Sequence, residues 1–333
     1  MDSMTQPANA ALRQAARLSV APMMDWTDRN CRRFHRLMSR RTLLYTEMVT
    51  APAIVHGDRA RLLDFDAAEH PLALQLGGSD PAELREAARI ATDWGYDEIN
   101  LNVGCPSDRV QSGAFGAVLM KTPELVADCV TAMQAVSPVE VTVKCRIGVD
   151  DQQADHILPA FLDSMRQAGI RRMTIHARKA WLQGLSPREN REIPPLDYPL
   201  VHAMKQQFPD LHLSINGGIA TLDQARRHLE QMDGVMIGRA AYHEPWNILG
   251  AADTLWGDMP PFRDPAQVAS AMRPLILDHL SQGGRLHQMT RHMLGLFHGL
   301  PGARGWKRTL SEGASKGGIE VYDAALAQVT EPA

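Results

Sequence analysis

The stretch from Asn100 to Met120 reads NLNVGCPSDRVQSGAFGAVLM. Over Glu98–Val103, apolar residues alternate with the amides Asn100 and Asn102, which predicts a short strand with one polar face. The strand leads into Gly-Cys-Pro and a loop rich in serine and glycine, so Cys105 is expected at a strand's carboxyl end. A lone cysteine beside a turn is more often a small buried hydrophobe. In a barrel of alternating strands and helices, however, catalytic groups lie at that end, so the neighbours decide its role.

Strand and helix patterns alternate along most of the chain. The predicted strands are Leu18–Pro22, Thr42–Glu47, Leu72–Leu76, Glu98–Val103, Val139–Arg146, Arg172–His176, Leu211–Asn216 and Gly234–Ile237. The predicted helices are Asp28–Arg40, Ala51–Leu63, Pro81–Trp94, Pro123–Val136, Gln153–Ala168, Leu196–Phe208, Leu222–Gln231 and Tyr242–Leu255. Such units over about 250 residues predict a (β/α)8 barrel spanning 18–258. An open doubly wound sheet is the alternative, but the glycine fingerprint GxGxxG and the P-loop pattern are both missing.

The composition is that of an ordinary globular protein, with 44% apolar and 22% charged residues among 333. The four cysteines show neither CxxC spacing nor a disulfide framework, which predicts free thiols, a reducing compartment and no metal site. Residues 1–17 contain two arginines and no apolar signal core, so we expect a flexible tail and a cytoplasmic protein without a membrane partner. The formal net charge of −3 does not by itself indicate nucleic-acid binding, and nothing predicts a protein partner.

Side chains alternate between the two faces of a strand. In VTVKCRIG, Thr142, Lys144 and Arg146 therefore share the face opposite the apolar residues. The same rule turns further polar side chains toward the barrel interior, namely Gln75, Asn100, Asn102, His176, His212, Ser214 and Asn216. Burying so many polar groups costs about 1–3 kcal/mol each unless a partner satisfies them. The pattern therefore predicts a ligand at the strand ends.

Two glycine turns indicate the chemistry of that ligand. Asn216-Gly217-Gly218 follows the seventh predicted strand, and Gly238-Arg239 follows the eighth. Glycine turns expose backbone N–H groups beside a helix start, and an arginine adds charge-assisted hydrogen bonds to an anion. Because barrels often hold phosphate after strands seven and eight, these turns predict a phosphate site.

The pattern of alternating strands stops near Trp256, and residues 259–333 predict a small helical domain. From His279 to Ser311 there is no Asp or Glu, whereas five Lys or Arg residues and four histidines occur. Such a stretch resembles a surface for a phosphate backbone, with Arg304 and Lys307 one helical turn apart. The loop after the sixth strand adds Arg178, Lys179, Arg188 and Arg191, which could extend this surface to the barrel mouth.

These motifs together resemble the tRNA-dihydrouridine synthases, most closely their A subfamily. The resemblance runs from about Ser19 to Gly313 without a departure at a motif position. It is carried by APMMDWTD at 21–28, LQLGG at 74–78, NLNVGCPS at 100–107, KCRIG at 144–148, HARKAW at 176–181, LSPRENR at 185–191, NGG at 216–218 and GR at 238–239.

The resemblance implies an enzyme that holds FMN in the barrel mouth and reduces D-loop uridines 20 and 20a of tRNA, with NADPH, or alternatively NADH, recharging the flavin. It implies that Cys105 is the general acid that protonates C5 of uracil after hydride reaches C6. Asn102 could hold the uracil edge. The implied flavin-binding residues are Pro22, Met23, Met24, Gln75, Lys144, His176, Asn216, Gly217, Gly218, Gly238 and Arg239. The helical domain would bind tRNA.

Two hypotheses of other classes remain open at this point. A flavin barrel acting on a free small molecule, such as dihydroorotate or an enone, explains the strand ends but not the acid-free helical stretch. A non-catalytic RNA-binding protein with the same fold explains the basic stretch but not Cys105 beside a flavin constellation. Flavin absorbance near 450 nm separates the second from both enzymes, and retention of tRNA separates the two enzymes.

Overall fold

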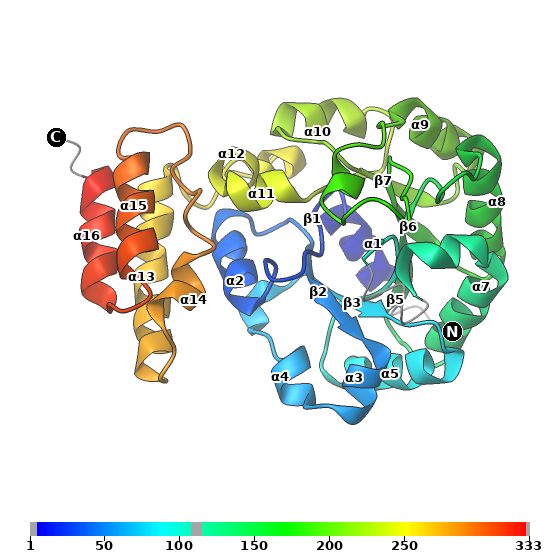
Figure 1. Ribbon diagram of the computed structural model, residues 1–333, viewed down its shortest axis with the longest axis horizontal. Helices are drawn as coiled ribbons and strands as arrows, with labels where there is room; N and C mark the ends of the chain where they lie inside the picture. Colours follow the sequence, from blue (N-terminus) through cyan, green and yellow to red (C-terminus); the bar gives the residue numbers. More distant parts are fainter. Residues whose placement is uncertain (1–4, 108–114, 331–333) are drawn as a thin grey trace.

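The computed structural model describes residues 5–107 and 115–330, and its centre is a barrel of parallel strands (Figure 1). The strands are β1 (Leu18–Val20), β2 (Leu44–Thr50), β3 (Leu72–Gly77), β4 (Glu98–Val103), β5 (Glu140–Arg146), β6 (Arg172–His176), β7 (His212–Asn216) and β8 (Gly234–Ile237). From β2 to β8 each strand pairs with the next in chain order, and β1 pairs with β8. A parallel bridge between Ser19 and Leu43 closes the ring beside β2. The predicted (β/α)8 barrel is therefore confirmed, and the open sheet is excluded.

Helices surround the barrel on the outside (Figure 1). They are α2 (Arg29–Met38), α3 (Ala51–His56), α4 (Arg59–Leu63), α5 (Pro81–Asp93), α7 (Pro123–Gln134), α8 (Ala154–Gln167), α9 (Tyr198–Gln207), α10 (Leu222–Leu229), α11 (Arg239–His243) and α12 (Pro245–Leu249). Outward-facing strand residues such as Leu101, Val143 and Ile175 are fully buried in the same apolar cluster as helix residues. Burial of this layer stabilises the barrel and leaves its interior to the polar face.

Two predicted helices are interrupted in the structure. The helix expected at Ala51–Leu63 is divided into α3 and α4, because Gly57 ends the first and Asp58 caps the second by accepting from the Arg61 N–H. The helix expected at Tyr242–Leu255 is wrong in its bounds. It consists of α11, α12 and a 3-10 turn at Ala252–Trp256, and α12 begins with a proline, which lacks the N–H that a continuous helix needs.

The N-terminal segment differs from the flexible tail expected over 1–17. Helix α1 (Thr5–Ala15) packs Leu12, Ala15 and Ala16 against Tyr45 and other residues of a small apolar cluster. The Val235 N–H donates to the Arg17 carbonyl, and Trp256 Nε1 donates to the Gln14 carbonyl at 2.9 Å. The segment thus lies at the amino ends of the strands, away from the predicted site. An apolar stripe on a short helix, rather than a flexible tail, is the pattern that sequence inspection missed.

The C-terminal helices form a bundle beside the barrel (Figure 1). They are α13 (Pro265–Ser281), α14 (Leu286–Thr290), α15 (Ala303–Gly313) and α16 (Ile319–Thr330). Trp306 is fully buried, packs edge-on against Phe297 and Tyr322, and donates from Nε1 to the Met293 carbonyl at 2.9 Å. A buried, hydrogen-bonded indole of this size fixes the packing of α15 in the bundle.

Charged and polar contacts at Asp28 join the bundle to the barrel. Asp28 caps α2, and the same carboxylate accepts from Arg291 at 2.6 Å and pairs with His292 at 3.0 Å. His292 is fully buried and its other ring nitrogen lies 3.2 Å from the hydroxyl of Tyr242. Burial acts to raise the pKa of Asp28, but His292 and Arg291 lower it from 3.8 to about 2. The carboxylate therefore favours its charged form more strongly in the folded protein than in the unfolded chain.

We predict an acid-dependent loss of stability at this contact. A carboxylate with a depressed folded pKa stabilises the protein above its unfolded pKa, so this contribution, about 2 kcal/mol, is lost as pH falls from about 4 to 2. Urea unfolding across this range measures it. Asp28→Asn should remove this pH-dependent loss of unfolding free energy, whereas Asp58→Asn, at the exposed cap of α4, should retain it. Identical pH profiles for wild type and Asp28→Asn would contradict the role given to Asp28.

Candidate active site

The predicted polar residues meet at the carboxyl ends of β3–β7. Strand register pairs Asn102 with Lys144, Arg146 with His176, and His176 with Asn216. Because neighbouring strands in this register carry these side chains on the inward face, the polar groups form one lining at the barrel mouth. The alternation along the strands therefore predicts the composition of the lining.

Cys105 lies in the loop directly after β4 and is partly exposed. Its backbone N–H donates to Asn102 Oδ1 at 2.9 Å, and its carbonyl accepts from the Ala117 N–H. The thiol lies 3.5 Å from the Ser107 hydroxyl. The other three cysteines of the chain are fully buried. Cys105 is therefore the cysteine with access to a molecule in the barrel mouth.

The amides Asn102 and Gln75 bind to protein groups in the structure. Asn102 Oδ1 accepts from the N–H groups of Gly104 and Cys105, and its Nδ2 donates to Gln75 Oε1 at 2.8 Å. Gln75 Nε2 donates to Asn100 Oδ1 at 2.8 Å. The sequence suggested the Asn102 amide for the uracil edge, and the oxygen of that amide already holds the loop that carries Cys105. Among the described residues, one N–H of each amide has no acceptor and can therefore donate to a ligand.

Lys144 and His176 have open polar atoms at the mouth. Within the described residues, neither the Lys144 ammonium nor a His176 ring nitrogen makes a hydrogen bond or an ion pair. Burial, followed by the charge of Arg146, lowers the pKa of Lys144 to about 8. Burial and the charges of Arg146 and Lys144 hold the pKa of His176 well below its ordinary value. At pH 7 the site thus presents an ammonium and a neutral imidazole that lack partners, as expected for groups that bind a ligand.

The two glycine turns lie beside these groups. Gly217 and Gly218 have φ values of 114° and 69°, and a Cβ on Gly217 would lie 2.4 Å from Cδ2 of His176. Gly238 approaches Met23, whose sulfur would be 3.6 Å from an added Cβ. Arg239 donates to Glu192 Oε1 at 2.6 Å, so its guanidinium is held at the rim. Positive φ and the close approach of His176 require glycine at position 217, and a glycine turn of this kind is typical of the predicted phosphate site.

The basic residues of the loop after β6 differ in what they contact. Arg178 donates to the carbonyls of Glu192 and Pro194, although its buried Nε lacks a partner. Lys179 lies over the ring of Trp181 at 5.7 Å, and the largely exposed Arg188 approaches Glu192 at 3.6 Å. Among the described residues, the Arg191 guanidinium has no hydrogen bond or ion pair. Arg191 is therefore the cation of this loop most available to a ligand.

Sequence reasoning missed two residues that shape the site. Arg146 is buried and donates to the carbonyls of Gly104, Lys179 and Asn190, which ties the Cys105 loop to the loop after β6. Asn190 is fully buried, accepts from the Trp181 N–H and donates to the Trp181 carbonyl. Arg146 was on the inward face by alternation, which was the available signal. The position of Asn190 in a loop gave none.

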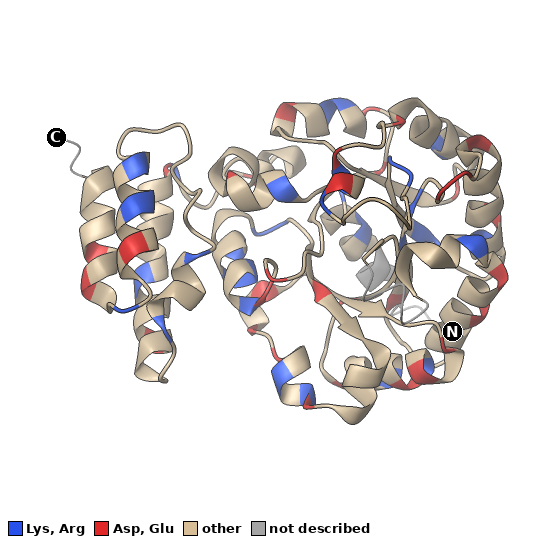
Figure 2. Ribbon diagram, in the orientation of Figure 1, with Lys and Arg blue, Asp and Glu red and all other residues tan. Residues whose placement is uncertain are grey.

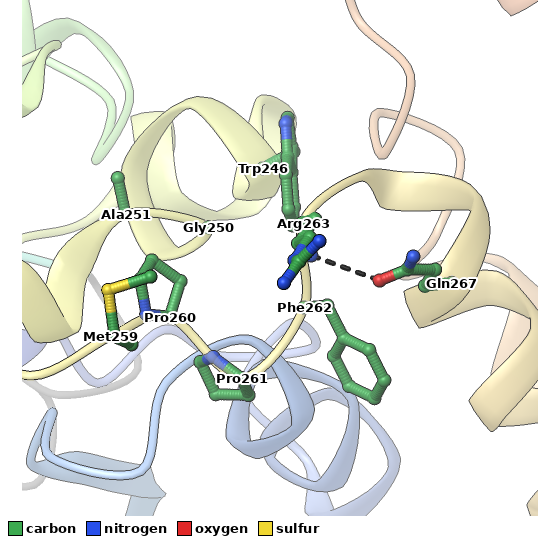
Figure 3. Close-up of a pocket in the computed structure, with 9 residues that line it drawn as sticks. All are labelled: Trp246, Gly250, Ala251, Met259, Pro260, Pro261, Phe262, Arg263 and Gln267. Carbon is green, nitrogen blue, oxygen red and sulfur yellow. Dashed lines mark hydrogen bonds between the residues drawn. The ribbon is translucent and has the colours of Figure 1, made fainter.

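A cavity of about 800 Å³ lies elsewhere, between α12 and the segment leading to α13 (Figure 3). Trp246, Met259, Pro260, Pro261 and Phe262 line it, with Arg263 bound to Gln267 at its rim. It contains none of the predicted site residues.

In the described part of the chain, no helix is long and apolar enough to cross a membrane.

The barrel and its polar mouth define the protein as a (β/α)8-barrel enzyme. A family model described as dihydrouridine synthase matches residues 19–330, so the chain belongs to the dihydrouridine synthase family. The resemblance found in the sequence is confirmed.

Relatives of similar length share more than half of the residues. The tRNA-dihydrouridine(20/20a) synthase of Vibrio cholerae is 55% identical over 318 residues, covering 95% of this chain and 97% of the relative. The protein of the same name in Escherichia coli strain K12 is 56% identical over 329 residues, covering 98% and 95%.

Solved structures with the same barrel are much more distant in sequence. An old yellow enzyme homologue from Zymomonas mobilis has a TM-score of 0.51 at 13% identity, covering 69% of this chain and 86% of that one. Morphinone reductase has a TM-score of 0.51 at 14% identity, covering 76% and 88%. At these identities the likeness supports the fold.

We predict that Gly217→Ala destabilises the protein more than Gly184→Ala. Both glycines have positive φ, so alanine costs about 1–2 kcal/mol at either position. Only at Gly217 does the added Cβ meet another residue, and displacing His176 should cost about 1–3 kcal/mol more. Urea unfolding of both variants measures the difference. Equal losses of unfolding free energy would show that the turn at Gly217 is not closely packed.

Proposed function

We propose that this chain is an FMN-dependent tRNA-dihydrouridine synthase that reduces uridines 20 and 20a of the D-loop. The observation that carries the proposal is the partly exposed Cys105 thiol at a barrel mouth whose Lys144 ammonium and His176 imidazole lack partners among the described residues. The names of the Vibrio cholerae and Escherichia coli relatives support the same activity. We further propose that the barrel, 18–258, is the catalytic domain and acts in the cytoplasm, and that residues 259–333 bind tRNA.

The mouth of the barrel suits FMN in charge and shape. The glycine turns with Asn216, Gly238 and Arg239 would hold the phosphate, because they offer open N–H groups and a cation at one rim. Lys144, His176 and the remaining N–H of Gln75 would bind the ring system. Pro22, Met23 and Met24, at the loop after β1, would pack against it. A phosphate is the group that a glycine cradle with an adjacent arginine most readily accepts.

When bound, FMN would supply the hydride for C6 of uracil, and NADPH or NADH would supply its reducing electrons. Lys144 stabilises negative charge at the ring edge, because its pKa of about 8 keeps it protonated at pH 7. Cys105 donates a proton to C5 of uracil from its thiol and regains one from solvent. The remaining N–H of Asn102 and the guanidinium of Arg191, which is unpaired among the described residues, would hold the uracil edge.

A basic surface of the bundle is proposed to hold the RNA outside the pocket. Arg304 and Lys307 are exposed on α15, and neither has an ion pair within the described residues. Figure 2 shows Lys and Arg positions in blue on this helix. Arg291 and His292, from the same acid-free stretch, bind Asp28 instead and therefore join the bundle to the barrel. With Arg178, Lys179, Arg188 and Arg191 at the mouth, the surface can offset the few kcal/mol that unstacking a uracil requires.

The direct test is incubation of the purified protein with FMN, NADPH and unmodified tRNA, followed by mass analysis of tRNA fragments. Two added hydrogens on a D-loop uridine are expected. Reduction of a free enone or pyrimidine, with tRNA unchanged, would contradict the RNA substrate.

We predict that Cys105→Ala retains FMN and its reduction by NADPH but forms dihydrouridine about 10²–10⁴-fold more slowly, because a positioned general acid is lost. Stopped-flow absorbance separates the two half-reactions. Cys129→Ala, on the buried face of α7, is the matched control and should behave as wild type. Turnover by Cys105→Ala at the wild-type rate would return this thiol to a packing role.

We predict that Arg304→Ala with Lys307→Ala weakens tRNA binding and lowers its salt dependence. Each lost phosphate contact removes about 0.7–0.9 from the log–log slope. FMN content and NADPH oxidation should be unchanged, because those properties belong to the barrel. Arg85→Ala with Arg89→Ala, on the exposed face of α5, provides the control. Filter binding across a salt series measures the slopes, and equal slopes in all three proteins would exclude α15 from the interface.

A further inference from the structure

A continuous chain of hydrogen-bonded side chains crosses the barrel interior from its floor to the Cys105 loop. At the floor, Glu98 Oε2 accepts from Arg172 at 2.6 Å, and Glu98 Oε1 accepts from the Thr142 hydroxyl. Thr142 Oγ1 accepts from Asn100 Nδ2 at 2.8 Å. The amides described above then continue the chain from Asn100 through Gln75 and Asn102 to the Cys105 N–H.

The chemistry of each group allows this chain to run in one direction. A carboxylate bound to arginine only accepts, so the single hydrogen of Thr142 points to Glu98. The threonine oxygen must then accept from Asn100, which turns the carbonyl of that amide toward Gln75. Gln75 in turn presents its own oxygen to Asn102. The oxygen of Asn102 is thereby directed to the Cys105 loop.

Burial of these side chains stabilises this direction of the hydrogen-bond chain against its reverse. Glu98 is fully buried, and Gln75, Asn100 and Thr142 are at most 2% exposed. Water therefore cannot replace a missing partner, and a reversed amide would face a like group at each end. Glu98 is the first residue of β4, and Cys105 follows the far end of that strand. The ion pair of Glu98 with Arg172 therefore acts on Cys105 through the chain of amides.

We propose that Glu98 and Thr142 are positioning residues for Cys105, because they fix the direction of the amide chain that holds its backbone. The reaction that this serves is the one proposed above, and in that respect the inference rests on the proposed function. Reversing the chain would turn the Asn102 amide nitrogen toward the N–H groups of Gly104 and Cys105. The loop would lose two hydrogen bonds, and the thiol would lose its fixed place relative to the mouth.

A purely structural role for these groups is the alternative, and conservative variants distinguish it. Thr142→Val keeps the shape but removes the hydroxyl, whereas Thr142→Ser keeps the hydroxyl and loses a methyl group. Glu98→Gln can present an N–H to Thr142 while Arg172 retains Glu140 at 3.0 Å, and it should therefore reverse the chain. If Thr142 served only packing, Thr142→Ser would preserve the amide exchange and alkylation of Cys105 no better than Thr142→Val.

The experiment measures hydrogen exchange of the Gly104 and Cys105 amides and the pH profile of Cys105 alkylation by iodoacetamide. In Thr142→Val and Glu98→Gln we expect exchange on the order of five- to tenfold faster, the size of effect of one hydrogen bond. We also expect a shifted alkylation profile. Thr142→Ser should match wild type in both. Uridine reduction should fall about tenfold or more in the first two variants, since small misplacements of reacting groups are costly.

The proposal would be overturned if folded Thr142→Val showed the exchange and alkylation of wild type. Equal effects of Thr142→Ser and Thr142→Val on these two measurements would also overturn it. If Thr142→Val does not fold, Glu98→Gln compared with Thr142→Ser decides the question by the same two measurements. Exchange and alkylation need no tRNA substrate. They therefore report on the amide chain even if wild type fails to form dihydrouridine, which would refute the proposed function alone.

Discussion

The ion pair between Glu98 and Arg172 at the floor of the barrel is the interaction on which the polar interior depends. Burial acts to lower the pKa of Arg172, but Glu98 and Glu140 raise it above its ordinary value, so the guanidinium remains charged. A buried pair of this kind adds little net stability but fixes the groups bound to it. Here those groups are the amides leading to Cys105, so the floor and the mouth of the barrel form one hydrogen-bonded system.

The mouth differs from the floor because two of its cations lack partners among the described residues. Lys144 and Arg191 have no ion pair within the described residues, whereas Arg172 has two carboxylates. Uncompensated positive charge in a half-buried site is costly in the isolated protein and favourable once an anion binds. The contrast between a satisfied floor and an unsatisfied mouth is the physical reason for placing a phosphate-bearing cofactor and an RNA substrate at one end.

Much of the fold follows from the sequence, because strand alternation and helix caps are local. The bounds predicted for β4, β6 and β8 agree with the structure, and inward-facing residues such as Gln75 and His176 lie where alternation placed them. The helix at 5–15 and the break before Pro245 have local signals, an apolar stripe and a proline, that the sequence reading did not use. By contrast, no spacing could show that Asn102 holds the Cys105 loop or that Arg291 binds Asp28, since these contacts join distant segments.

The central claim is that the barrel mouth binds FMN through its phosphate as well as its ring. Titration of the flavin-free protein with FMN and with riboflavin, followed by flavin fluorescence, tests this most directly. The account predicts that FMN binds about 100-fold or more tightly than riboflavin, because charge-assisted hydrogen bonds to Arg239 and the glycine turns act on the phosphate alone. Equal affinities for the two flavins, or binding of neither, would contradict it.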